Sequence, residues 1–111
     1  MSLEPEEFKC KCCGKLVLDK VFLATARMAR QISSTPYIIS SGYRCAKHNR
    51  EVGSTSRNHI EGKAMDIQAR TNIERGKILK GLYLAGFTRV GIHRRFIHAD
   101  SMDKLEACWI Y

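Results

Sequence analysis

The chain has 111 residues, a length that fits one domain with a single hydrophobic core. Hydrophobic residues make up 44% and charged residues 27%, a composition that excludes a disordered or fibrous chain. No apolar run is long enough to span a membrane, and the first ten residues lack the apolar stretch of a secretory signal. The net charge of +8 favours a polyanionic partner, such as nucleic acid, an anionic membrane or another anionic polymer.

We expect a single domain over residues 1–111, with residues 1–7 as a flexible arm. The chain has five cysteines: Cys10, Cys12, Cys13, Cys45 and Cys108. An odd count without a signal peptide indicates reduced thiols and synthesis in the cytoplasm. The cluster "FKCKCCGK" resembles half of a zinc ribbon, which Cys45 and Cys108 would have to complete. Free thiols are the favoured interpretation, and a structural zinc is the alternative.

Two helices are predicted. The first runs from Asp19 to about Ile32, with Asp19 as its N-cap and with Val21 and Met28 among the apolar residues at helical spacing. The second follows Thr71 or Asn72, either of which can cap it. Its apolar residues on or near one stripe are Ile73, Ile78, Leu79, Leu82 and Leu84, and Gly86 can end it.

Short β-branched or alternating runs predict the strands. They lie at residues 37–41, 63–69, 89–94, 96–100 and 108–111. Between the first two strands lies a long polar stretch over residues 41–59, and a loop of that length in a small domain is usually functional. The predicted fold class is therefore α+β, with a small antiparallel sheet packed with two main helices.

Three side chains are candidate metal ligands: His59, Asp66 and His98. His59 ends the polar stretch, whereas Asp66 and His98 lie inside predicted strands. A carboxylate in a core strand needs a partner, because burying an isolated charge is costly. Two imidazoles and one carboxylate suit zinc and leave a fourth position open. The alternatives are ordinary core histidines and an ion pair between Asp66 and a lysine or arginine.

The ordered segments "SGYR…HN", "H..G.A.DI", "GF.RVGIH" and "FIHAD" resemble the zinc D-Ala-D-Ala carboxypeptidase and endolysin-type peptidoglycan peptidases. That family shares its fold with the hedgehog signalling domain, and the resemblance covers residues from about Phe8 to Tyr111. It implies a hedgehog/DD-peptidase-like fold and one catalytic zinc ion bound by His59, Asp66 and His98. It also implies hydrolysis of an amide bond in a peptidoglycan stem peptide.

The resemblance also assigns roles around the metal. Arg44, in "SGYR", is implied to contact the substrate, and Ser41 and Ser56 are further candidates for substrate binding. His93 matches a position where some members of the family keep a catalytic histidine. Asp100 would orient an imidazole through its free ring nitrogen and is a weaker candidate for the base.

Two positions depart from the pattern of the family. Many relatives carry an acid three residues before the last histidine, but Arg95 stands there. His93 is therefore the first candidate for the general base, ahead of Asp100 and Glu61. The serine that is usual two residues before the first histidine is replaced by Arg57, with Ser56 one place earlier.

The sequence thus supports three functions. The first is a zinc peptidase acting on a peptidoglycan peptide, as a monomer with no membrane span and no nucleic-acid partner. It would be made in the cytoplasm and would act on the cell wall if the chain is phage-derived. The second is a zinc-holding but inactive wall-binding module, which lacks a base near the metal. The third is a basic nucleic-acid-binding protein.

Overall fold

The structure is a computed structural model that describes residues 3–54 and 59–111. Its elements in chain order are η1 (Pro5–Phe8), α1 (Lys20–Ser33), β1 (Ile39–Ser41), α2 (Ala46–Glu51), β2 (Ala64–Gln68), α3 (Asn72–Ala85), β3 (Arg89–Ile92), β4 (Phe96–Asp100) and β5 (Ala107–Ile110). The α+β fold class is confirmed. The helix α2 was not predicted, and it lies inside the stretch that the sequence predicts as a loop. No helix in the described part of the chain is both long and apolar enough to cross a membrane.

The five strands form one sheet in the order β1-β2-β4-β3-β5. Neighbours are antiparallel except β3 and β5, which run parallel, so the predicted all-antiparallel sheet is mixed. After β4 the chain crosses to the far side of β3 before β5 begins. This crossover gives β5 the direction of β3.

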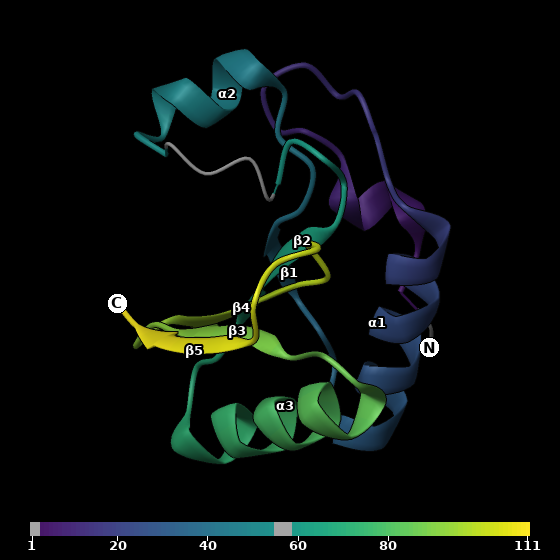
Figure 1. The fold of residues 1–111 in the computed structure, drawn as a ribbon, viewed down its shortest axis with the longest axis vertical. Coiled ribbons are helices and arrows are strands. Elements are labelled where there is room, and N and C mark those ends of the chain that lie inside the picture. The colour runs from purple at the N-terminus through teal and green to yellow at the C-terminus, as the bar shows by residue number, and fades with distance from the viewer. Residues whose placement is uncertain (1–2, 55–58) are drawn as a thin grey trace.

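The helices lie around the sheet as Figure 1 shows: α3 lies below it, α1 along its side, and α2 above it on the side away from α3. Phe22 of α1 is fully buried. Its ring meets those of Phe8 and Phe87 edge to face, at centroid distances of 6.1 Å and 5.9 Å respectively. The helices α1 and α3 approach closely at Gly81, where any side chain would collide with Ala29 and Ser33 of α1.

The buried face of α1 differs from the predicted stripe. Its buried residues are Phe22, Ala26, Ala29 and Ser33, whereas Val21 is 75% and Met28 is 53% exposed. In α3, Ile78 and Leu82 are buried as predicted, but Ile73 and Leu84 are exposed. In α3 apolar residues lie around most of the circumference, so spacing alone does not select its inner face.

The helix boundaries follow the predicted caps. Asp19 accepts a hydrogen bond from the Phe22 amide at 2.8 Å, and Thr71 accepts one from the Glu74 amide at 3.0 Å. Gly86 ends α3 in a left-handed conformation. The predicted flexible arm is packed from residue 3 onward: Leu3 is buried, and its carbonyl accepts a hydrogen bond from Arg27 at 2.8 Å.

Candidate metal centre

Asp66 and His98 face each other across two neighbouring strands. They are paired in the antiparallel register of β2 and β4, and both side chains are buried. Their neighbours in sequence, Met65 and Ile97 among them, are fully buried in the hydrophobic core. Since side chains alternate between the faces of a strand, Asp66 and His98 must project from the opposite face.

His59 joins this pair from the loop that precedes β2. One ligand atom from each of His59, Asp66 and His98 lies within 4.8 Å of the other two. The Oδ1 atom of Asp66 is 2.9 Å from His98 Nδ1 and 3.5 Å from His59 Nε2. The structure therefore brings together all three residues that the sequence singled out as ligands.

Each histidine is oriented by a hydrogen bond at its other ring nitrogen. The Nδ1 atom of His59 donates to the Gly42 carbonyl at 2.6 Å, which leaves Nε2 facing Asp66. The Nε2 atom of His98 donates to Asp100 Oδ2 at 2.7 Å, which leaves Nδ1 facing Asp66. Such bonds fix the ring and the tautomer of a metal-binding histidine. Two nitrogens and one carboxylate oxygen, all held and converging, fit a zinc ion.

Hydrogen bonds and charges hold these side chains together. Burial opposes the charge on Asp66, but hydrogen bonds to His59 and His98 outweigh burial and place the pKa of Asp66 well below its usual range. Burial likewise opposes the charged form of His98, yet its bonds to Asp100 and Asp66 raise the pKa of His98 above its usual value. His98 and the two carboxylates therefore stabilise each other's charged forms.

Asp100 accepts the hydrogen bond from His98 and is itself held in place by two further hydrogen bonds. Its other oxygen, Oδ1, accepts a hydrogen bond from Arg89 Nε at 2.7 Å and one from the Met102 amide at 3.2 Å. Burial works against its charge, but the bonds from His98 and Arg89 lower the pKa of Asp100. With its oxygens engaged in this way, Asp100 is placed to orient His98.

Arg44 enters the same site from the segment between β1 and α2. Its guanidinium is mostly buried, and Nη2 lies 3.5 Å from Asp66 Oδ2. Ser41 accepts a hydrogen bond from Nε at 3.0 Å, and Asn49 accepts one from Nη1 at 3.1 Å. Asn49, the buried residue of α2, thus helps to position Arg44. Ser56 lies outside the described residues.

The metal centre opens into a cleft of about 580 Å³. The cleft is lined by Arg44, Val52, Ser54, His59, Asp66, Phe96, His98, Trp109 and Tyr111. Trp109 and Tyr111 belong to this wall, and no motif in the sequence pointed to them. The strand register explains the position of Trp109. Across β2, β4, β3 and β5 the successive partners are Asp66, His98, Gly91 and Trp109.

The structure does not place His93 in this cleft. The His93 ring stacks on Phe96, with centroids 4.4 Å apart, and meets Tyr111 edge to face at 5.4 Å. Its Nδ1 atom accepts a hydrogen bond from the Arg95 amide at 3.1 Å. His93 therefore stands at the rim, behind two residues that line the cleft. Glu61 and Arg95 do not line the cleft either.

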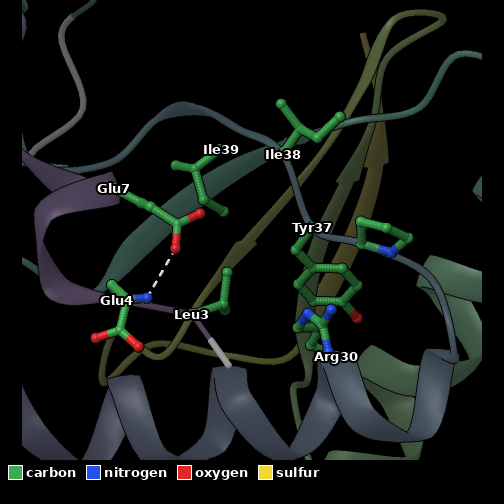
Figure 2. A pocket seen from close by; sticks show the side chains of 8 residues that line it. Leu3, Glu4, Glu7, Arg30, Tyr37, Ile38 and Ile39 are labelled. Atoms are coloured by element: carbon green, nitrogen blue, oxygen red, sulfur yellow. Dashed lines mark hydrogen bonds between the residues drawn. The ribbon is translucent and has the colours of Figure 1, made fainter. Parts of the chain in front are cut away.

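A larger cleft, of about 780 Å³, lies away from the metal centre. Figure 2 shows its wall, formed by the N-terminal residues Leu3, Glu4 and Glu7 and by the segment around Tyr37. The dashed line marks the bond from the Glu4 amide to the Glu7 carboxylate, 2.7 Å long. None of the three metal-binding candidates lines this cleft, so its size does not make it the site of chemistry.

The fold and the site define a small α+β domain with a buried His–Asp–His centre that opens into a cleft. A family model described as Peptidase M15 matches residues 2–100, so the chain belongs to the peptidase M15 family. The resemblance to zinc D-Ala-D-Ala carboxypeptidases is confirmed at this level, and peptidases of this family depend on zinc. No curated protein matches the chain.

Proposed function

We propose that this chain is a zinc metallopeptidase that hydrolyses an amide bond in peptidoglycan stem peptides. It would act as a D,D-carboxypeptidase or as an L,D- or D,D-endopeptidase. One observation supports the proposal above the rest: in a chain of the M15 family, His59, Asp66 and His98 converge at the floor of a cleft. The net charge of +8 suits an anionic cell-wall polymer.

Zinc would be held by His59 Nε2, the Asp66 carboxylate and His98 Nδ1. When bound, it supplies a Lewis acid that polarises a carbonyl and makes water nucleophilic near neutral pH. The chain's own contribution is to fix the ring orientation and the tautomer of the two histidines. The Gly42 carbonyl does this for His59, and Asp100 does it for His98.

Arg44 would bind the substrate. Ser41 and Asn49 already fix its guanidinium at the wall of the cleft, so little side-chain freedom is lost when a substrate arrives. A guanidinium can pair with a terminal carboxylate of the peptide or stabilise the oxyanion that develops during attack. Ser41 would then act through Arg44, while Ser56 stays a candidate for direct contact with the substrate.

His93 would carry the proton between the attacking water and the leaving amine. Its ring contacts Phe96 and Tyr111, both of which line the cleft, so the imidazole lies directly behind the wall of the cleft. Its Nδ1 atom is engaged by the Arg95 amide, which leaves Nε2 for the transfer.

A second function, a zinc-holding wall-binding module without catalysis, is favoured by one specific observation. Among the described residues that line the cleft, His59, Asp66 and His98 are the only acidic or imidazole side chains. If all three hold the metal, no carboxylate or imidazole among the described residues that line the cleft is left over as a base.

Mass spectrometry of purified peptidoglycan fragments separates the two functions. Zinc-loaded protein should release a product with a new free amine, and the mass of that product identifies the bond. A His59→Ala variant should release none, whereas the matched control His48→Ala, outside the cleft, should stay active. Peptidoglycan fragments that stay intact after incubation with the zinc-loaded parent chain would favour the inactive module.

A further inference from the structure

Four of the five cysteines meet at a second place, away from the His–Asp–His centre. We call Cys10, Cys12, Cys13 and Cys45 the cysteine cluster. The Sγ atoms of Cys10, Cys12 and Cys45 lie within 4.8 Å of one another. The Cys13 thiol interacts with the thiols of Cys10 and Cys45. The chain after η1 and the chain entering α2 lie at the same end of the molecule, as Figure 1 shows.

The backbone around Cys10 is folded into a tight turn. The Cys10 amide donates to the Lys15 carbonyl and the Gly14 amide donates to the Cys10 carbonyl, both at 2.8 Å. Gly14 has φ +72°, a left-handed conformation that glycine adopts without strain. This turn directs the amides of Cys12 and Cys13 towards the sulfur of Cys10, and the Cys45 amide reaches the same sulfur at 3.4 Å.

Amide donors around a sulfur favour the thiolate, which is the form that binds metals. Cys10 is only 2% exposed, and the amides of Cys12, Cys13 and Cys45 are directed at its sulfur. Cys45 is similarly engaged, since its sulfur accepts a hydrogen bond from the His48 amide at 3.4 Å. A buried thiolate needs a cationic partner, because an unpaired buried charge is costly.

We propose that Cys10, Cys12, Cys13 and Cys45 bind a structural zinc ion. Tetrahedral bonds of about 2.3 Å put sulfur atoms roughly 3.8 Å apart, and the sulfurs of Cys10, Cys12 and Cys45 already lie within 4.8 Å of one another. On binding, the thiols would release their protons to solvent, and no redox partner is needed. Zinc with four thiolates carries a net negative charge, and Lys9, Lys11, Lys15 and Lys47 flank the cysteines to offset it.

The site would couple the N-terminal segment to the substrate side of the molecule. Cys45 directly follows Arg44, and the neighbouring Tyr43 amide donates to the Phe8 carbonyl at 2.8 Å. A zinc ion joining Cys10 to Cys45 would fix the chain on one side of Arg44, and the hydrogen bond from the Tyr43 amide fixes it on the other. Its role would be structural, because four protein ligands leave no open position for a substrate.

Zinc content of the full chain, purified under reducing conditions, tests this inference independently of the catalytic site. A His59→Ala/His98→Ala double variant should retain one zinc ion per chain by elemental analysis. Adding Cys12→Ser, at an exposed position, or Cys45→Ser should remove that ion. The matched control Cys108→Ser, on β5, should leave it in place.

Cobalt substitution gives a second measurement. It needs no cysteine variant, so it is unaffected if one of those variants fails to fold. The cobalt-loaded double variant should show the intense near-ultraviolet absorption of thiolate-to-cobalt charge transfer, and a mercurial reagent should abolish it. A double variant that is folded but free of zinc, with cysteines found as free thiols or as a disulfide, would overturn the proposal. Loss of the ion in His48→Ala but not in Cys13→Ser would overturn the assignment of four thiolates.

Discussion

The imidazole of His98 is held between two carboxylates, with Nε2 donating to Asp100 at 2.7 Å and Nδ1 facing Asp66 at 2.9 Å. The bond to Asp100 keeps the proton on the far nitrogen and leaves the near one for a metal. Arg89 completes the chain of contacts by binding Asp100. The site is therefore oriented by residues that never touch the cleft itself.

Loss of this orientation should weaken metal binding. We expect Asp100→Asn to lower zinc affinity by roughly 10- to 100-fold, because the amide no longer offers a charged acceptor to His98. Competition with a chelator of known affinity measures the change. Asp103→Asn, at an exposed acid, is the matched control. Unchanged affinity in Asp100→Asn would show that the bond does not support the ligand.

Zinc affinity should also depend on pH. Hydrogen bonds to Asp100 and Asp66 raise the pKa of His98, and a metal must displace the proton from Nδ1. Affinity should then be highest above that pKa and fall about tenfold for each pH unit below it. The lowered pKa of Asp66 keeps its carboxylate charged across the same interval. Calorimetric titration with zinc at a series of pH values tests this, with a flat profile as the contrary result.

The role of His93 can be separated from metal binding. His93→Gln should lower kcat by roughly 10²- to 10⁴-fold while zinc content stays unchanged, because the side chain lies outside the ligand set. Because a general base works only when it is deprotonated, the acidic limb of the pH–rate profile should disappear with it. If the variant keeps full turnover on peptidoglycan fragments, the proton is carried by another group.

Gly91 gives Trp109 its place in the cleft wall. A side chain at Gly91 would collide with the Trp109 ring, which lies 5.3 Å from the His98 ring. We expect Gly91→Ala to displace the indole and lower the free energy of unfolding by about 1–3 kcal/mol. Urea unfolding measures it, with Gly76→Ala in α3 as control, since that position has open space. Equal stability of Gly91→Ala and the parent chain would rule the contact out as a constraint.

The sequence was most informative where a residue type conflicted with its surroundings. Asp66 between Met65 and Ile67 is a charge in a core strand, and that conflict pointed to a ligand before any geometry was known. The caps Asp19 and Thr71 were also visible, because their signals are local. The fold class followed from these local patterns.

Features that depend on tertiary contacts could not be predicted from local sequence patterns. The parallel pairing of β5 with β3 is set by the path of residues 101–106 and brings Trp109 into the site. The hydrogen bond from Arg44 to Asn49 depends on α2, a short helix with a weak pattern. The position of His93 behind Phe96 likewise reflects packing at the edge of the cleft.

Diffraction at the zinc absorption edge, from crystals of the zinc-loaded chain, would test the central claim most directly. We expect an anomalous peak bonded to His59 Nε2, the Asp66 carboxylate and His98 Nδ1, with bonds of about 2.0–2.2 Å. An anomalous map without a peak among these three residues, in crystals whose zinc content is verified, would contradict the assignment.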